Sequence, residues 1–198
     1  MSYSININTI RAAHFCAASK DVRQTINGVL LDFKNDHINI VATDGHLLAA
    51  YRDEYINTGE EFSIIIPIDV VKLMLKMVVK GQECIELEEL DDNWWQLGDI
   101  KFTITNDKFP DYQRVIQRNN SRSTSDGAHP RFNPNQLLRA QKSINIRMGY
   151  KPSSPSAGFM SYGVNANDSA VLHDGTGNSV VVIMPMRFTE KTYMGFNV

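Results

Sequence analysis

The hydrophobic positions of this chain repeat one pattern three times. In each copy a short apolar strand leads into a segment of helical period, and segments of alternating apolar and polar residues follow. Pro67 and Pro134 stand at the starts of the second and third helical segments, where a first turn tolerates a missing N–H. The predicted strand-and-helix pairs are Ser4–Ile7 with Thr9–Ser19, Ser63–Ile66 with Pro67–Lys80, and Arg131–Asn133 with Pro134–Ile144.

The alternating segments predict antiparallel strands. Asn-Asp, Asp-Gly and Gly-Asn turns stand between several of them, as in strand meanders. With the three helices, this pattern predicts an α+β fold in which helices lie on one face of antiparallel sheets. The predicted strands are Val29–Phe33, His37–Thr43, Leu47–Tyr51, Cys84–Leu87, Trp94–Leu97, Ile100–Thr105, Phe159–Val164, Ser169–Leu172 and Ser179–Met184.

The repeat also predicts the domain organisation. A sheet with a helix on one face leaves each unit half covered, so two units packed together would share a core. We therefore expect residues 1–116, which hold the first two units, to form one complete domain. Residues 117–129 are rich in Asn, Ser and Arg without periodicity and predict a flexible linker. The third unit, residues 130–198, is then an odd half-domain with a C-terminal extension.

Composition places the chain among ordinary globular proteins. Hydrophobic residues make up 42% of the 198 residues and charged residues 21%. No apolar run approaches the ~20 residues that a membrane span needs, and Met1–Ser4 does not resemble the start of a secretory signal. The two cysteines, Cys16 and Cys84, stand in apolar contexts and predict reduced core thiols. These features favour a cytoplasmic protein that does not bind membranes.

The charge balance excludes a uniformly basic surface. The net charge is −2, whereas DNA-binding domains are often strongly basic. The distribution is uneven, because basic residues fall on the predicted helices, and a protein can be acidic overall yet basic on the one surface that meets phosphate. The acidic residues cluster at Glu83, Glu86, Glu88, Glu89, Asp91 and Asp92.

The sequence favours a protein that is not an enzyme. No nucleophile and base stand in a recognisable pattern. His46 lies two residues from Asp44, which could suggest metal or general-base chemistry, but a histidine in a turn is the more economical interpretation. We therefore expect no catalytic residue, no metal and no cofactor. The five histidines show no metal-ligand spacing and stand at His14, His37, His46, His129 and His173.

Four segments carry a family resemblance. Val41–Ala49 reads VATDGHLLA, Lys108–Ile116 reads KFPDYQRVI, and Val182–Arg187 reads VIMPMR. They resemble the VATDGHRLA, FPDYRRV and VMPMR segments of the bacterial DNA sliding clamp, the beta subunit of DNA polymerase III. Asp21–Leu30 resembles the start of the middle domain of that family. Each match alone is weak, but the four stand in the family's order, and the resemblance covers residues 4–116 and 130–188.

The resemblance implies the DNA clamp fold in a shortened form. The family chain has three domains of two units each, so this chain resembles the middle domain followed by the second half of the third. It lacks a match to the family's first domain, and Leu47 replaces the arginine of the TDGHR motif. Phe188–Val198 stand where family members end or nearly end. A shortened clamp would fit a phage or mobile-element origin.

Basic residues at helical spacing are candidates for DNA binding. Lys72, Lys76 and Lys80 recur every fourth residue and share one helix face. From spacing alone, a solvated stripe on an amphipathic helix is the better interpretation. In the clamp family this helix lines the central channel, so the resemblance implies sequence-independent phosphate contacts. The candidate residues are Arg11, Lys20, Arg23, Lys72, Lys76, Lys80, Arg139 and Lys142.

The resemblance also implies a binding pocket for partner peptides. One wall of this pocket comes from the complete domain and the other from the odd unit. Both walls have a match in this chain, although much of the family chain has none. For each residue taken singly, a core or turn position is the simpler interpretation. Methionine suits a pocket with several partners, because its thioether chain repacks easily. The candidates are Ile26, Thr43, Gly45, His46, Leu48, Pro110, Arg114, Val115, Val182, Met184, Pro185, Met186 and Arg187.

These features lead to two functional hypotheses, with an enzyme that uses the Asp44–His46 region as the least favoured third. The first is a processivity or accessory factor of DNA replication that associates with duplex DNA and binds peptides of a DNA polymerase or clamp loader. The second is a clamp-mimicking peptide-binding module that competes for clamp partners without encircling DNA. Ring closure would need two odd units of a homo-oligomer to pair across a two-fold axis. The other arrangement packs the odd unit only on its own complete domain.

Overall fold

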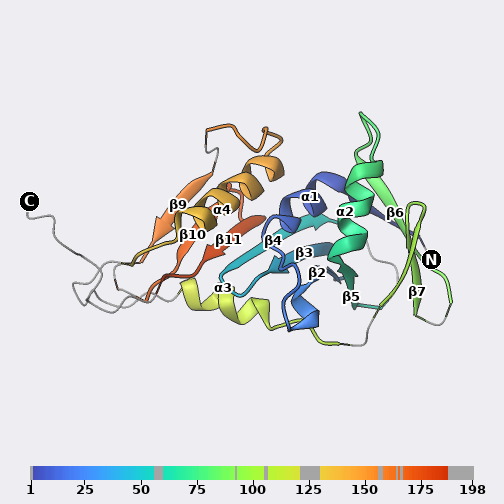
Figure 1. Cartoon of the computed structure of the whole chain (residues 1–198), viewed down its shortest axis with the longest axis horizontal. Helices are drawn as coiled ribbons and strands as arrows, with labels where there is room; N and C mark the ends of the chain where they lie inside the picture. The colour runs from blue at the N-terminus through green and yellow to red at the C-terminus, as the bar shows by residue number, and fades with distance from the viewer. Residues whose placement is uncertain are drawn as a thin grey trace, which may run out of the picture.

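Two antiparallel sheets and four α-helices make up the described part of this computed structural model, which covers residues 2–55, 60–91, 93–104, 107–120, 130–155, 158–163, 165 and 167–186 (Figure 1). The α+β fold expected from the sequence is confirmed. The four-stranded sheet has the order β1 (Ser2–Asn6), β6 (Cys84–Glu89), β7 (Trp94–Leu97) and β8 (Ile100–Thr103). The seven-stranded sheet has the order β5 (Phe62–Pro67), β2 (Gly28–Phe33), β3 (His37–Thr43), β4 (Leu47–Glu54), β11 (Ser179–Ile183), β10 (Ala170–His173) and β9 (Phe159–Tyr162).

The first two units exchange their opening strands. β1, from the first unit, pairs along β6 of the second, with Tyr3 opposite Leu87. β5, from the second unit, pairs along β2 of the first, with Ile66 opposite Val29. The first strand of each meander, β2 or β6, is therefore hydrogen-bonded to the opening strand of the other unit. This exchange makes the first two units one folding body, because neither sheet is complete without both units.

Three helices cover one face of the seven-stranded sheet (Figure 1). They are α1 (Ile7–His14), α2 (Ile68–Met77) and α4 (Pro134–Arg147). The Asn6 side chain caps α1 by accepting hydrogen bonds from the backbone N–H groups of residues 8 and 9, and Asn133 caps α4 by accepting one from the N–H of residue 135. Ile10, Val71 and Ile144, one from each helix, are fully buried in a single core with the sheet. The core therefore joins all three units.

A fourth helix, which the sequence pattern did not predict, covers the opposite face of the sheet. This helix, α3, spans Tyr112–Asn120. Tyr112 and Phe109 pack with Leu30, Leu48 and Val182, whose side chains point away from the first three helices. The expected linker at residues 117–129 therefore begins with helix, and its residues 121–129 lie outside the described part of the chain. The second helix layer explains why every residue of β2 is buried.

The third unit extends the sheet of the first. β11 pairs antiparallel with β4, with Val182 opposite Leu48 and Ile183 opposite Leu47. The strand predicted at residues 131–133 is absent, and these residues lead into α4 without regular structure. The strand exchange between the first two units supplies the reason. An opening strand pairs in the sheet of a sibling unit, and the described residues contain no sibling for the third unit.

Polar contacts, most of them partly buried, bind α4 to the first unit. Arg147 donates from Nη1 to Asp53 Oδ1 (2.5 Å) and Thr9 Oγ1 (2.7 Å), and from Nη2 to the Arg52 carbonyl (2.8 Å). The Arg147 and Asp53 side chains are only 17% and 19% exposed. Ser143 donates to the Ala12 carbonyl (2.6 Å). These bonds join residues far apart in sequence, so they hold the third unit in one orientation on the first.

Several element ends differ from the predicted ones. α1 ends at His14 instead of Ser19, because the chain turns there and the Ala18 N–H binds the Thr43 carbonyl. α2 ends at Met77, which leaves Lys80 in a turn just before Gly81, whose φ is 91°. The predicted bounds of β3 and β7 are confirmed. None of the described helices is long and apolar enough to span a membrane.

The two cysteines lie in different environments. Cys16 is fully buried, and burial raises the pKa of its thiol to about 12. Cys84, predicted to be a core thiol, is exposed at the start of β6. The reason is the strand's alternation, which buries Ile85 and Leu87 and turns Cys84 outward.

Removal of the Arg147 side chain is expected to destabilise the fold strongly. In Arg147→Ala, the partly buried Asp53 carboxylate loses its cationic partner and keeps only the hydrogen bond from Thr9 Oγ1. Breaking a buried pair costs about 3–5 kcal/mol. Because this pair is partly exposed, we expect the free energy of unfolding to fall by about 3 kcal/mol. Urea denaturation measures the loss. The matched control is Lys101→Ala on exposed β8; equal stability of the two variants would contradict the fastening role.

Candidate functional site

The turn between β3 and β4 is shaped by two side chains of the TDGH segment. Asp44 Oδ1 accepts hydrogen bonds from the backbone N–H groups of His46 (2.8 Å) and Leu47 (2.7 Å). Thr43 Oγ1 accepts from the Gly45 N–H (3.0 Å) and donates to the Leu47 carbonyl (2.6 Å). Gly45 has a φ of 87°, in the left-handed region that glycine adopts without strain. The turn is thus a fixed structural element.

The third unit holds this turn from the side. Arg139 of α4 donates from Nη1 to Asp44 Oδ2 (2.5 Å) and from Nε to the Phe15 carbonyl (2.9 Å). The Met184 N–H, just after β11, donates to the His46 carbonyl (2.8 Å). The same Asp44 carboxylate therefore orders its own turn and binds α4. As a result, the position of the turn depends on the docking of the third unit.

A cavity of about 150 Å³ lies beside this turn, between the sheet and the start of α3. Leu48 and Ile26 are buried in its wall, and Met184 reaches it from the third unit. Tyr112 donates to Asp32 Oδ2 (2.7 Å), and burial raises the pKa of its hydroxyl to about 12. The lining residues are Arg23, Ile26, Thr43, Gly45, His46, Leu47, Leu48, Pro110, Asp111, Tyr112, Val115 and Met184.

Most of the predicted pocket residues come together at this cavity. The structure places eight of them in the wall, namely Ile26, Thr43, Gly45, His46, Leu48, Pro110, Val115 and Met184. Val182 is fully buried behind the wall, beside Leu48. Pro185, Met186 and Arg114 lie outside the lining, and Arg187 is outside the described residues. Leu47, Asp111 and Tyr112 also line the cavity and were not predicted, although each is an immediate neighbour of a predicted residue.

Arg23, predicted to bind DNA, lies at the rim of the cavity. Its guanidinium binds the Asp21 carboxylate through Nε and Nη2, both at 3.0 Å. It also lies over Gly45, where an added Cβ would stand 2.9 Å from Nη2. Hydrogen bonds from Arg23 hold the pKa of Asp21 down, to about 2. Arg23 therefore carries a positive charge beside the opening, in an orientation set by Asp21.

The other predicted DNA-binding residues lie on the three-helix face and its adjoining loops. Arg11 is on α1, Lys72 and Lys76 are on α2, and Arg139 and Lys142 are on α4. Arg139 is already bound to Asp44 and two backbone carbonyls, so it acts chiefly as a structural contact. His14 lies on the same face, and burial lowers its pKa, so it adds no charge there at neutral pH.

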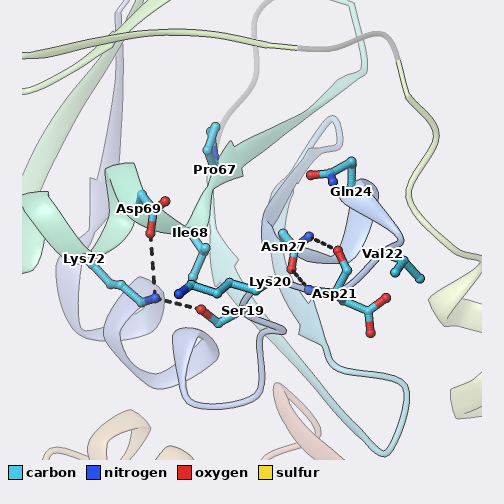
Figure 2. Close-up of a pocket in the computed structure, with 10 residues that line it drawn as sticks. All are labelled: Ser19, Lys20, Asp21, Val22, Gln24, Asn27, Pro67, Ile68, Asp69 and Lys72. Atoms are coloured by element: carbon cyan, nitrogen blue, oxygen red, sulfur yellow. Dashed lines mark hydrogen bonds and ion pairs between the residues drawn. The ribbon is translucent and has the colours of Figure 1, made fainter.

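A second cavity, of about 600 Å³, opens between the start of α2 and the loop that holds Lys20. Figure 2 shows the Lys72 ammonium group at the Ser19 hydroxyl, and Lys20 also lines the cavity. Lys72 donates to Ser19 Oγ at 3.0 Å and lies 3.7 Å from Asp69 Oδ1. Asp69 and Asp21 also line the cavity, so its walls carry both signs of charge.

The described residues contain no cluster of three or more His, Cys, Asp or Glu side chains able to hold a metal ion. His46 is exposed, and the oxygens of Asp44 are engaged by backbone N–H groups and by Arg139. The pair therefore forms part of a turn and shows no general-base geometry.

Solved structures identify the architecture as that of a DNA clamp. The DNA polymerase III beta subunit of Pseudomonas aeruginosa superposes with a TM-score of 0.64 at 19% identity, over 95% of this chain and 67% of that one. The beta subunit of Thermotoga maritima gives a TM-score of 0.67 at 15% identity, over 96% and 66%. At these identities the likeness establishes the fold, and the expected clamp fold is confirmed.

The sequence comparisons establish the family. Residues 3–116 match the family model of the DNA polymerase III beta subunit, central domain. The beta sliding clamp of Proteus mirabilis is 32% identical over 122 residues, which are 60% of this chain and 33% of that protein. The Escherichia coli K12 clamp is 32% identical over 113 residues, or 56% and 31%. The chain belongs to the DNA polymerase III beta subunit family and spans about a third of these relatives.

Substitution of Arg23 is expected to change the titration of Asp21. In Arg23→Ala, the pKa of Asp21 returns from about 2 toward its ordinary 3.8, because the guanidinium no longer binds the carboxylate. Since the folded pKa is depressed, the pair contributes to stability above pH 3.8, and the contribution is lost as the pH falls toward 2. NMR titration of the carboxyl carbon measures the shift. Arg114→Ala serves as the control; an unchanged Asp21 in Arg23→Ala would refute the pairing.

Proposed function

We propose that the chain is a non-catalytic accessory protein of DNA replication that binds short peptide segments of its partners in the 150 Å³ cavity. The observation that carries the proposal is the composition of the cavity wall. The turn, β4 and the start of α3 supply one side, and Met184 of the third unit supplies the other. Both walls of the cavity are present, although the chain spans only about a third of the length of its curated relatives.

The size of the cavity favours a peptide side chain over a small-molecule substrate. Ligand pockets typically enclose about 300–1,000 Å³, whereas this cavity has the volume for one large apolar side chain. Leu48, Val115 and Met184 offer apolar contacts, and Met184 can adjust to anchors of different shape. Arg23 and Asp111 stand in the lining as charged groups able to contact a peptide backbone. A leucine or phenylalanine anchor fits this chemistry, and peptides of a DNA polymerase or clamp loader are the proposed partners.

We further propose that duplex DNA binds weakly, and without sequence preference, along the three-helix face. Arg11, Lys72, Lys76 and Lys142 lie on helices of one face, and Lys20 and Lys80 lie in the adjoining loops. Such cations would contact phosphate and leave bases unread. Arg139 and Arg23 are less suited to this role, because Asp44 and Asp21 occupy their guanidinium groups.

A second candidate is a clamp-like module that binds partner peptides without encircling DNA. The three-helix face favours this alternative in one respect, because Leu73 and Met77 are 47% and 49% exposed between the lysines of α2. Asp69 lies one turn before Leu73, and the whole chain carries a net charge of −2. The two candidates share the peptide cavity and differ in their affinity for DNA.

The peptide proposal predicts that Met184→Ala weakens binding of a fluorescent peptide with leucine and phenylalanine anchors. The loss of apolar contact is about 1–2 kcal/mol, which raises Kd roughly 5- to 30-fold. Fluorescence anisotropy measures Kd. Met184 is only half buried, so the variant is expected to fold.

The matched control is Met186→Ala, which makes the same change two residues further along, outside the cavity lining. Its Kd is expected to stay within about twofold of the parent, as for a substitution distant from the contact. Equal weakening by both variants would place the peptide elsewhere. If the parent protein does not bind the peptide at high micromolar concentration, the proposed function is wrong.

The DNA proposal predicts a change in salt dependence. Combined Lys72→Ala, Lys76→Ala and Lys142→Ala is expected to reduce the slope of log K against log salt by about 2–3, because each lost phosphate contact removes about one. The control is combined Lys101→Ala, Lys108→Ala and Arg114→Ala, which removes the same charge from exposed positions on β8, in the loop before α3 and on α3, the helix of the opposite face. Equal slopes in the two triple variants would favour the module that does not encircle DNA.

A further inference from the structure

A cavity of about 260 Å³ lies on the sheet face that α3 covers, and neither the peptide proposal nor the DNA proposal uses it. Ala50 of β4, Val180 of β11 and Ile116 of α3 give it apolar sides. Tyr112 is the only residue that also lines the 150 Å³ cavity. The three-helix face is on the other side of the sheet (Figure 1), so DNA bound there does not reach this cavity.

Polar residues stand side by side across the strands at this cavity. Asn39 of β3 is opposite Arg52 of β4 in the ladder, and both residues line the cavity. The Arg52 backbone N–H donates to the carbonyl of Asn178, just before β11, at 2.8 Å. The Arg52 carbonyl accepts a hydrogen bond from Arg147 Nη2, also at 2.8 Å. The backbone of Arg52 is therefore held from both sides, which fixes the origin of its side chain.

The Arg52 guanidinium is oriented but not neutralised. Its Nε donates to Oδ1 of Asn39 at 3.4 Å, and Asn39 is only 8% exposed. In the part of the chain that the structure describes, the Arg52 side chain has no other hydrogen-bond partner and no ion pair. By contrast, Arg23, Arg139 and Arg147 each bind an aspartate. Both Nη groups of Arg52 are therefore available to an anion from outside the described chain.

The chemistry of the lining fits a carboxylate better than a phosphate. An arginine presents its Nη–H groups as a fork that matches the two oxygens of a carboxylate. Arg52 is the only cation in the lining, so it balances one negative charge, whereas a phosphate monoester carries about two. Ala50, Ile116 and Val180 can contact the methylene groups of an acidic side chain. A glutamate or aspartate side chain meets both requirements.

The open side of the cavity favours an occupant that belongs to a larger chain. Arg52, Gln113 and Asn178 line the cavity and are all exposed. Sites for free small molecules usually enclose most of the ligand surface, typically about 70–90%. A side chain that projects from a partner protein needs no such enclosure, because the rest of the partner covers the opening.

We propose that this cavity binds the carboxylate of a glutamate or aspartate in an acidic segment of a partner protein. The carboxylate accepts hydrogen bonds from Nη1 and Nη2 of Arg52, while Asn39 keeps the guanidinium in place. The proposal does not rest on peptide binding in the 150 Å³ cavity, because the two cavities share only Tyr112. Since both cavities border α3, one partner can contact both.

An NMR titration of the nitrogen-labelled protein with two short peptides tests the proposal. The probe is acetyl-Ala-Glu-Ala-amide, and acetyl-Ala-Gln-Ala-amide has nearly the same shape without the charge. At millimolar concentration the glutamate peptide is expected to shift the Arg52 Nε–H signal and the Asn178 amide signals, and the glutamine peptide is expected to leave them in place. Equal shifts with the two peptides, or no shift with the glutamate peptide, overturn the proposal.

Arg52→Gln is expected to weaken binding of the glutamate peptide at least about tenfold, because the hydrogen bonds to a charged group are lost. Arg52 is exposed, so the variant is expected to fold. The matched control is Arg114→Gln on α3, which changes another exposed arginine outside the lining and is expected to bind as the parent does. If the two variants weaken binding equally, the contact is not at Arg52 and the proposal is wrong.

Inorganic phosphate distinguishes the two classes of anion. It is expected to bind more weakly than the glutamate peptide, because Arg52 is the only cation in the lining. Tighter binding of phosphate than of the glutamate peptide, with the same signals shifted, would make the cavity a phosphate site and overturn the carboxylate assignment.

Discussion

The ladder between β4 and β11 is the interaction on which the candidate site depends. It sets Val182 opposite Leu48 and Ile183 opposite Leu47, and thereby brings the third unit to the turn after β3. From this ladder follow the contact of Met184 with His46 and that of Arg139 with Asp44. Without it the cavity would lose a wall, because β4 and the start of α3 line only one side.

The sequence was sufficient for the local elements and for many residues of the site. Alternating residues between clear turns gave β3 and β7 with their observed bounds. α3 was missed, although Tyr112, Val115 and Ile116 have helical spacing, because the polar residues after them favoured a linker. The strand exchange could not be derived from the sequence, since alternation shows that a strand exists but does not identify its ladder partner.

The two arginines of α4 show where reasoning from helical spacing is limited. Arg139 has the position of a phosphate-binding residue by family resemblance, and its guanidinium instead orders the turn at Asp44. Arg147, which was not singled out, makes the most buried ion pair among the described residues. Spacing places a charge on a helix face, but the neighbouring element decides whether that charge meets solvent or a carboxylate. In this chain the first unit supplies a carboxylate to each arginine.

The Asp44–Arg139 contact has a thermodynamic consequence. Asp44 shapes the cavity turn and also binds α4, so the shape of the cavity and the docking of the third unit are two parts of one equilibrium. A peptide that binds only the docked form adds RT ln(1 + [L]/Kd) to the free energy of docking. By the same linkage, anything that loosens the third unit lowers the apparent affinity of the cavity. The measured occupancy of the cavity therefore depends on how firmly the third unit docks on the first, as well as on the affinity for the peptide.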